Sequence, residues 1–305
     1  MAVLVTGASG FVGSVLVPLL LEQGHKVYAL SRHPPIGSAK LVPLVGDVTE
    51  ENLGLYSVPQ NIDAVYHLAG IIRLGKDKDG SIFQTNVEGT KNVISLCVKR
   101  GIRHLYHMST AYTYEYHNDY GRSKAQAEML VLESDIPDVT VFKPAIIMGT
   151  EDAPFPGHFV QFASGIVRVH RRADAIRRKI EGEMRLPILE PAFRVRGNPK
   201  GYLNLIQVNQ VAGAIANITN TGTYWLTNPK PSTLQELLDW ISETINVRVV
   251  FLPEFKPTPL EAIFQRLSAL FQPYLWGSDF KSNLPLCPPI SKEFIQATLK
   301  TSLKA

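Results

Sequence analysis

The chain has 305 residues, of which 45% are hydrophobic and 19% charged, and its formal net charge at pH 7 is +4. That length suffices for one large domain or for a core domain with a smaller one attached, and the composition excludes an intrinsically disordered chain. The mildly basic charge falls short of the footprint of a nucleic-acid-binding protein, so we expect no nucleic acid partner.

The first elements form a strand–helix–strand unit. Val3 to Val5 are typical of a buried parallel strand, an apolar segment of helical length ends at Gly24, and Lys26 to Leu30 form a second strand. Pro18 lies inside that helix and predicts a local kink, because proline removes a backbone donor. The apolar stretch 11–21 is too short to span a bilayer and follows no basic residue, so we expect no signal peptide and a cytoplasmic protein.

The alternation of strands and helices continues to about residue 149. Strands are expected at 64–70, 104–110 and 139–144, and helices at 83–100 and 120–133. Such repeated alternation predicts an α/β fold, in which helices cover both faces of a doubly wound parallel sheet.

After Gly149 the pattern loosens into loops, prolines and isolated helices, which are expected at 208–219, 232–244 and within 257–305. We therefore predict a core of residues 1–148 and a smaller, mostly helical substrate-binding region of residues 149–305. Late elements of the core are expected to interleave with that region near 200–230.

Three glycines mark the turn between the first strand and the first helix. Gly7, Gly10 and Gly13 are spaced three residues apart. Glycine at this place lets the backbone approach a pyrophosphate, whose charge the N-terminus of the helix stabilises. The context of a strand before and a helix after favours a dinucleotide site over an ordinary turn, which is the alternative.

The residue types at the end of the second strand bear on the choice of nucleotide. NAD-binding proteins place an acidic residue there to hydrogen-bond the ribose, whereas this chain has Ser31 and Arg32. A guanidinium can bind a 2′-phosphate directly, so the sequence favours NADP(H) over NAD(H). The alternative is that Arg32 is a solvated loop residue.

The stretch "MSTAYTYEYHNDYGRSK" contains a candidate catalytic pair. Tyr120 and Lys124 are spaced i, i+4 and share one face of a helix, and a lysine cation there favours the phenolate form of the tyrosine. The neighbouring tyrosines have no lysine four residues on, so we interpret them as loop or pocket residues; they are Tyr112, Tyr114 and Tyr116.

These motifs together resemble the extended branch of the short-chain dehydrogenases/reductases, oxidoreductases with a Rossmann-type fold. "TGASGFVG" resembles the TGxxGxxG of that branch, and "GDV", "HLAG", "NVEGT", YxxxK and "KP" follow in the same order over roughly residues 1–245. The resemblance implies that Thr110, Tyr120 and Lys124 are catalytic, with no metal. The cofactor-binding residues that it implies, together with those argued above, are Gly7, Ser9, Gly10, Phe11, Val12, Gly13, Ser31, Arg32, Asp47, Val48, Leu68, Ala69, Gly70, Asn86, Ser109, Lys124, Lys143 and Pro144.

Within the branch, two segments are similar to thioester reductases and fatty acyl-CoA reductases. These are "VGDVTEENLGL" (45–55) and "QPYLWGSDFKSNL" (272–284). The similarity implies reduction by NADPH of an acyl thioester, carried by CoA or a carrier protein, to an aldehyde. Alternatives are a ketone or aldehyde reductase of the dihydroflavonol or steroid type, a nucleotide-sugar epimerase or dehydratase with bound NAD, and a non-catalytic NADP(H)-binding protein.

Three further features leave alternatives open. The segment 168–179 carries six cations and one carboxylate; a solvated face is favoured over docking of a phosphate or an acidic carrier. An apolar stripe in 260–276 is expected to pack in the core, with acyl-chain burial or membrane-surface contact as the alternative. Cys97 and Cys287 are expected to be buried thiols, with a disulfide as the alternative.

The resemblance also implies a homodimer formed through the Tyr120 helix.

Overall fold

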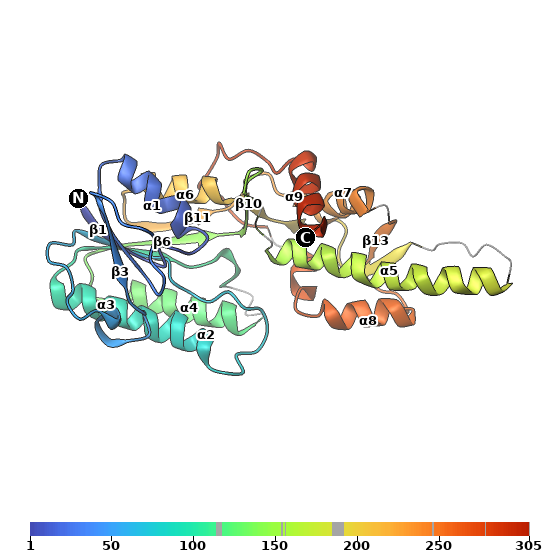
Figure 1. Ribbon diagram of the computed structural model, residues 1–305, viewed down its shortest axis with the longest axis horizontal. Helices are drawn as coiled ribbons and strands as arrows, with labels where there is room; N and C mark the ends of the chain where they lie inside the picture. The colour runs from blue at the N-terminus through green and yellow to red at the C-terminus, as the bar shows by residue number, and fades with distance from the viewer. Residues whose placement is uncertain are drawn as a thin grey trace. The chain divides into compact units, whose positions relative to one another are not determined.

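The computed structural model describes residues 1–113, 118–153, 155, 157–184, 192–245, 247–277 and 279–304. The chain folds into two compact units (Figure 1). The first unit consists of Met1–Ile146, Val208–Thr227 and Phe280–Cys287, and the second of Ile147–Gln207, Asn228–Asp279 and Pro288–Ala305.

The first unit is built on a seven-stranded sheet in which neighbouring strands are parallel, in the order β11-β6-β5-β4-β1-β2-β3. The order reverses direction between β1 and β4, and this reversal is the switch point at which such sheets bind ligands. The strands are β1 (Ala2–Thr6), β2 (Lys26–Ser31), β3 (Leu41–Val45), β4 (Ala64–His67), β5 (His104–Met108), β6 (Asp138–Pro144) and β11 (Gly222–Leu226).

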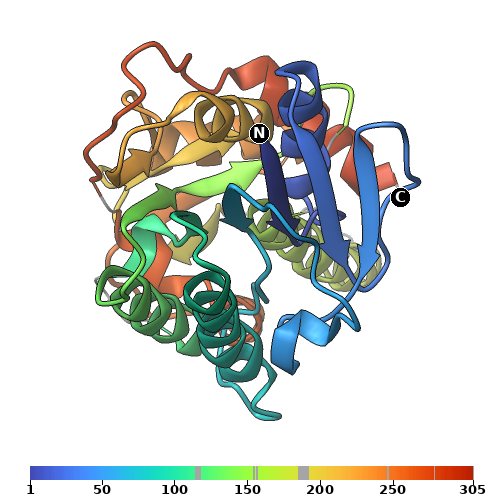
Figure 2. The ribbon, with the colours of Figure 1, turned by 90° about the vertical axis from the view of Figure 1, so that its left-hand side faces the viewer.

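Helices cover both faces of this sheet (Figure 2). α1 (Gly13–Glu22) packs beside α6 (Val208–Asn217) on one face, and α3 (Gly89–Arg100) packs beside α4 (Asp119–Leu132) on the other. The shorter helical segments of this unit are η1 (Glu51–Gly54), α2 (Ser81–Phe83), η2 (Gln84–Glu88) and η3 (Ala111–Thr113). The predicted doubly wound α/β fold of Rossmann type is confirmed.

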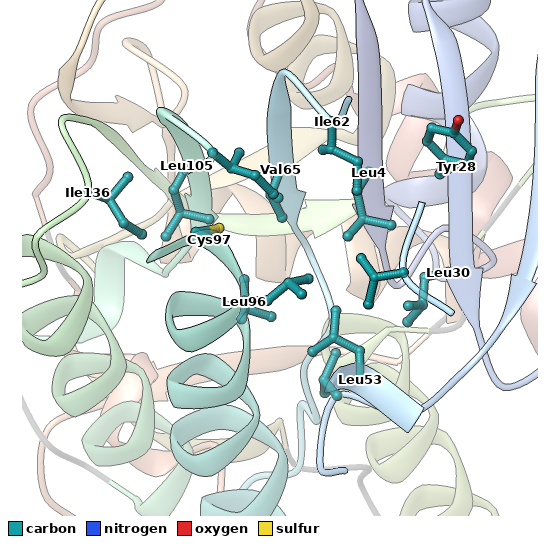
Figure 3. Packing of buried hydrophobic residues seen from close by; sticks show 14 of the residues in the cluster. Leu4, Tyr28, Leu30, Leu53, Ile62, Val65, Leu96, Cys97, Leu105 and Ile136 are labelled. Atoms are coloured by element: carbon teal, nitrogen blue, oxygen red, sulfur yellow. The ribbon is translucent and has the colours of Figure 1, made fainter. Parts of the chain in front are cut away.

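The core on the α3 face combines apolar side chains from the sheet and from α3 with others from the connecting segments, among them Leu53, Ile62 and Ile136 (Figure 3). Leu4, Val65 and Leu105 lie on neighbouring strands and are fully buried against Leu96 and Cys97 of α3. These strands are apolar on both faces because helices cover both, as expected for a parallel sheet.

Most expected elements of the first unit are present with small shifts at their ends. β3 was missed because Pro43 interrupts its short apolar run, and the structure places it at the edge of the sheet, where proline is tolerated. α1 runs as one helix with Pro18 inside it. Cys97 and Cys287 are both buried and form no disulfide with each other.

The second unit contains more strands than the sequence predicted. Its helices are α5 (His158–Met184), α7 (Leu234–Ile245), α8 (Pro259–Leu267), η4 (Gln272–Trp276) and α9 (Lys292–Lys304). Three two-stranded sheets pair β7 (Ile146–Met148) with β10 (Leu205–Gln207), β9 (Tyr202–Leu203) with β12 (Ser232–Thr233), and β8 (Phe193–Arg196) with β13 (Val249–Leu252). These strands have two to four residues, too few for a periodic pattern to show. Among the described residues no helix has the length and apolarity needed to cross a membrane.

Candidate active site

The glycine turn lies at the switch point of the sheet. Gly7 follows β1 with a φ of +71°, in the left-handed region, and a Cβ there would come within 2.8 Å of the Ala69 nitrogen in the neighbouring loop after β4. A Cβ at Gly13 would collide with the carbonyl oxygen of Gly7. Glycine is therefore required at both positions, because the close approach is to backbone rather than to a side chain that could move.

The glycine turn leads into the N-terminus of α1, and its outer residues are exposed. Its backbone closes through a hydrogen bond from the Gly10 nitrogen to the Gly7 oxygen of 2.9 Å, and the exposed residues Ser9 and Gly10 form its outer edge. Phe11 and Val12 lead half-buried into the helix, which begins at Gly13. The orphan N–H groups and the dipole at such an end suit a pyrophosphate, so the turn fits a dinucleotide.

The ends of β2 and β3 carry the residues predicted to bind the adenosine part of the cofactor. The Ser31 hydroxyl is buried yet has no hydrogen-bond partner among the described residues, and Arg32 beside it is exposed. A buried hydroxyl without a partner is costly unless a ligand or water satisfies it, so this position fits a polar group of the nucleotide. The Asp47 carboxylate accepts from the nitrogen and hydroxyl of Thr49, at 2.9 Å each, and Val48 is buried.

Asn86 joins the loop after β4 to α4. Its side-chain oxygen accepts from the Ile71 nitrogen at 2.8 Å, and its side-chain nitrogen donates to the Ile71 oxygen and to the Ser123 hydroxyl. Asn86 lies in the π-helical segment η2, a type of irregularity that is frequent at functional sites. These bonds hold Leu68 to Gly70 beside α4.

Helix α4, which carries the predicted catalytic residues Tyr120 and Lys124, begins with a side-chain cap. The Asn118 oxygen accepts from the Gly121 nitrogen at 2.9 Å, which places Tyr120 in the first turn and half-buried. This first turn of α4 packs on η3, since a Cβ at Gly121 would lie 3.2 Å from the backbone carbonyl oxygen of Tyr112. The N-cap thus sets the position of Tyr120 relative to the end of β5.

Lys124 lies one turn beyond Tyr120 and is buried. Its ammonium donates to the carbonyl oxygen of Met108 at 2.7 Å, and a Cβ at Gly70 would come within 3.1 Å of it. Burial lowers the pKa of Lys124 to about 8, because desolvation disfavours the ammonium. This cation is therefore fixed between the ends of β4 and β5.

Thr110 follows β5 at the same edge of the sheet. Within the described part of the chain its hydroxyl has only long contacts, donating to the Pro144 oxygen at 3.5 Å and accepting from the Tyr112 backbone nitrogen at 3.4 Å, although the residue is buried. Contacts of this length are weak, so the hydroxyl can turn to a substrate oxygen at little cost. The structure thus brings Thr110, Lys124 and the α4 turn of Tyr120 to the carboxyl ends of β4 to β6.

Ser109 and Lys143 contact a residue that sequence reasoning missed. Both donate to the carboxylate of Glu128, the serine hydroxyl at 2.6 Å and the lysine ammonium at 2.6 and 2.8 Å. The signal available in the sequence was the position of Glu128, four residues after Lys124 and therefore on the same face of the helix.

A pair of buried histidines was also missed. His67 and His107 are paired on β4 and β5, with ring centroids 5.4 Å apart. Burial, with Lys124 nearby, lowers the pKa of His67 to about 3 and that of His107 well below its usual range. His67 contacts the hydroxyls of Thr6 at 2.8 Å and Thr90 at 3.0 Å, whereas neither ring nitrogen of His107 has a hydrogen-bond partner among the described residues.

The aromatic, basic and apolar features singled out in the sequence differ in their burial. Tyr112 is buried edge-on to Phe280, with ring centroids 4.9 Å apart, while Tyr114 and Tyr116 lie outside the described residues. On α5, the described side chains of the basic segment are exposed at Arg168, Arg171, Arg172, Arg178 and Lys179, and Arg178 pairs with Asp174. Of the apolar stripe 260–276, Phe264 packs on Phe162 and Phe193, whereas Ile263, Leu267 and Leu270 are exposed.

The parallel sheet, the glycine turn at its switch point and the buried lysine of the YxxxK pair define a Rossmann-type protein of the NAD(P)-dependent kind. The sequence model of the NAD dependent epimerase/dehydratase family matches residues 3–161, more than half of the chain, and the chain belongs to this family. The expected resemblance to the extended short-chain dehydrogenases/reductases is thereby confirmed.

Named relatives show similarity over part of the chain. A 3-beta-hydroxysteroid dehydrogenase of Mycolicibacterium neoaurum is 35% identical over 155 residues, which are 43% of this chain and 42% of the relative. A 2-alkyl-3-oxoalkanoate reductase of Stenotrophomonas maltophilia is 32% identical over 175 residues, 50% of this chain and 52% of the relative. The chain thus spans about half the length of these curated relatives.

Among solved structures, the terminal R domain from the myxalamid PKS-NRPS biosynthetic pathway superposes with a TM-score of 0.71, over 99% of this chain and 90% of that one. The two sequences are 20% identical, so this likeness shows a common fold.

Proposed function

We propose that the protein is an NADPH-dependent oxidoreductase that reduces the carbonyl carbon of an acyl thioester to an aldehyde. The observation that carries the oxidoreductase assignment is the buried Lys124 ammonium, held at 2.7 Å by the Met108 carbonyl one helical turn from Tyr120. A structural turn has no need of a desolvated cation, whereas a phenol that must transfer a proton does.

Each of the three catalytic residues has one role in this proposal. When bound, the nicotinamide would supply a hydride to the thioester carbon; the resulting hemithioacetal then loses the thiol of CoA or the carrier, which leaves the aldehyde. Tyr120 donates its phenolic proton to the oxygen on which charge develops, and Lys124 stabilises the phenolate that remains. The Thr110 hydroxyl donates a second hydrogen bond to the same oxygen, and a single lost donor of this kind costs about 10²–10³ in kcat.

The preference for NADPH rests on the end of β2. The Ser31 hydroxyl, without a partner among the described residues, and the exposed Arg32 guanidinium offer a donor and a charge to a 2′-phosphate. Neither residue carries the carboxylate that would repel this phosphate. NADPH is therefore expected to bind more tightly than NADH.

The thioester assignment is supported by the segment that enters the first unit at Phe280. This segment is part of the stretch resembling acyl-CoA reductases, and Phe280 contacts Tyr112, two residues after Thr110. The R domain named above, which comes from a PKS-NRPS biosynthetic pathway, has the same fold. A carrier protein or CoA would then deliver the acyl group in the cytoplasm.

A second candidate function is the reduction of a ketone. It is favoured by the names of two relatives that match about half of the chain, a hydroxysteroid dehydrogenase and an oxoalkanoate reductase. The same three residues would serve it, since a ketone and a thioester both develop negative charge on the carbonyl oxygen.

The test is a panel of acyl-CoAs, carrier-bound acyl groups, ketones and aldehydes, assayed by loss of NADPH absorbance at equal concentrations and repeated with NADH. Oxidation of NADPH with thioesters supports the first function, and oxidation with ketones alone supports the second. A protein purified with tightly bound NAD that consumes no reduced cofactor would instead act as an epimerase or dehydratase.

Tyr120→Phe removes the transferable proton and leaves the ring. We expect loss of nearly all turnover with the best substrate of the panel and an unchanged dissociation constant for NADPH. The matched control is Tyr56→Phe, since Tyr56 is fully exposed and lies between η1 and β4. Full activity of Tyr120→Phe would contradict the site assignment.

A further inference from the structure

The structure contains a buried ion pair directly beside the candidate active site. Glu128 lies on α4 one turn beyond Lys124, and one of its carboxylate oxygens accepts both from the Ser109 hydroxyl and from the Lys143 ammonium, each at 2.6 Å. The second oxygen accepts from Lys143 at 2.8 Å, and the same ammonium donates to the Thr113 hydroxyl at 2.7 Å.

Almost no solvent reaches this pair. Ser109 and Lys143 are each 1% exposed, and the Glu128 side chain is 14% exposed. Burial lowers the pKa of Lys143, and the Glu128 carboxylate opposes that shift by bonding to the ammonium. A buried ion pair of this kind is poor at stabilising a fold compared with apolar residues of the same volume, so its presence suggests that it specifies a geometry.

The geometry that it specifies is that of the segment carrying Thr110. Ser109 immediately precedes Thr110 and Thr113 follows it by three residues, so both sides of the segment are bonded to the Glu128–Lys143 pair. Among the described residues, Thr110 itself makes only the two long contacts given above. Its position is therefore set by its neighbours rather than by its own side chain.

Aromatic rings enclose the pair further. The Lys143 ammonium lies 5.2 Å from the centre of the Trp225 ring, and Phe280 stacks on Trp225 with centroids 5.8 Å apart. Asn283 holds this arrangement through two hydrogen bonds to the backbone of Trp225. The Asn283 side-chain oxygen accepts from the Trp225 backbone nitrogen at 2.7 Å, and the Asn283 backbone nitrogen donates to the Trp225 carbonyl oxygen at 2.9 Å. The low exposure of Lys143 and Glu128 to water strengthens the electrostatic attraction between them.

We propose that Glu128, Lys143 and Ser109 are positioning residues that hold Thr110 at the substrate oxygen, acting through the segment 109–113. Lys143 and Ser109 then contact the protein rather than the nucleotide, in contrast to the cofactor-binding role that the family resemblance implies for them. The catalytic part of this inference rests on the proposed function.

The experiment uses the full chain with the double substitution Glu128→Met and Lys143→Met. Removing both charges while keeping similar volume avoids an unpaired buried charge, so the protein is expected to fold. We expect an unchanged dissociation constant for NADPH, measured by cofactor fluorescence, and a fall in kcat of about 100-fold with little change in KM, as for a small misplacement of a catalytic group. Lys143→Arg, which keeps the cation, should retain more of kcat than the double variant.

Two controls make the result specific. Glu133→Met removes an exposed carboxylate at the end of α4 and should leave every parameter unchanged. Methyl NMR of threonine-labelled protein, assigned with Thr110→Ser, reports the position of Thr110 without any substrate. In the double variant the Thr110 methyl signal should shift or broaden, while that of the exposed Thr301 stays in place.

The outcomes separate this inference from the proposed function. An unmoved Thr110 signal, or weakened NADPH binding with kcat intact, would overturn the positioning role. A wild-type protein that binds NADPH and reduces nothing in the panel would overturn the proposed function, and the Thr110 signal would then still decide whether the ion pair holds this segment.

Discussion

At the scale of single residues, the proposed chemistry depends on how little water reaches Lys124. The ammonium is kept by one backbone carbonyl, at 2.7 Å from the Met108 oxygen, and no carboxylate hydrogen bond to it is present among the described residues. Desolvation is therefore the main influence on the pKa of Lys124 and lowers it to about 8, close to physiological pH. A lysine that titrates there can lose its charge within an accessible pH range, which makes its role measurable.

We predict that kcat for the reduction is level at neutral pH and falls above about pH 8, as Lys124 loses its proton and no longer favours the Tyr120 phenolate. The measurement is the pH profile of kcat at saturating substrate and NADPH. Lys124→Met should abolish the reaction, whereas Lys91→Met, at a half-exposed lysine of α3, should keep the wild-type profile. A wild-type profile that stays level to pH 10 would contradict the assignment.

The same shift has a consequence for stability. Since the pKa of Lys124 in the folded chain lies below its ordinary value of 10.5, the unfolded chain binds more protons between about pH 8 and 10.5. The contribution of Lys124 to the free energy of unfolding therefore rises with pH across that window.

At the scale of elements, the junction between β1 and α1 is constrained by close contacts between backbone atoms. The helix begins directly above the glycine turn, and the missing side chain at Gly13 lets the helix pack on the Gly7 carbonyl. The turn is anchored to the sheet, because the Gly7 nitrogen donates to the Leu30 oxygen at 2.9 Å. A change in this packing must move a helix, not a flexible side chain.

We predict that Gly13→Ala destabilises the protein by about 1–3 kcal/mol, the usual cost of overpacking, and weakens NADPH binding. The matched control is Gly213→Ala in α6, where a Cβ would meet nothing within 4 Å. That change should stabilise the protein by about 1 kcal/mol through helix propensity alone. Urea unfolding and cofactor titration measure both effects, and equal stability of the two variants would refute the packing argument.

At the scale of the whole molecule, covering both faces of the sheet leaves His67 and His107 without solvent. The Thr90 hydroxyl donates to the backbone carbonyl oxygen of Asn86 at 2.7 Å, so it accepts from Nε2 of His67. This arrangement fits a neutral imidazole with its proton on Nε2. Both rings have pKa values far below the ordinary 6.5, whereas in the unfolded chain they would titrate normally. Acid therefore favours the unfolded state.

We predict that the free energy of unfolding is highest above pH 6.5 and falls as the pH drops below it, by up to about 1.4 kcal/mol per pH unit for each histidine. Urea unfolding at a series of pH values between 7.5 and 5 measures this slope. His107→Leu should remove the contribution of one histidine to this slope. The protein should tolerate the change at pH 7.5, because neither ring nitrogen of His107 has a hydrogen-bond partner among the described residues. His33→Ala, at an exposed position, should leave the slope unchanged, and identical slopes in wild type and His107→Leu would contradict the prediction.

The sequence alone determined most of the architecture of the first unit, β3 excepted, because strand runs, helical segments and glycine spacing are local patterns that follow from backbone sterics and burial. It also indicated Tyr120 and Lys124 through their helical spacing, and Thr110 through the family resemblance, because neither kind of signal needs knowledge of distant contacts. Only the tertiary structure decided what Ser109 and Lys143 touch. Glu128 lies 19 residues from the one and 15 from the other, and their meeting depends on how α4 packs against the ends of β5 and β6. Likewise only the fold shows that Phe280 returns to Tyr112 and that His107 is sealed from water, because burial is a property of the packed layers and not of any short stretch of chain.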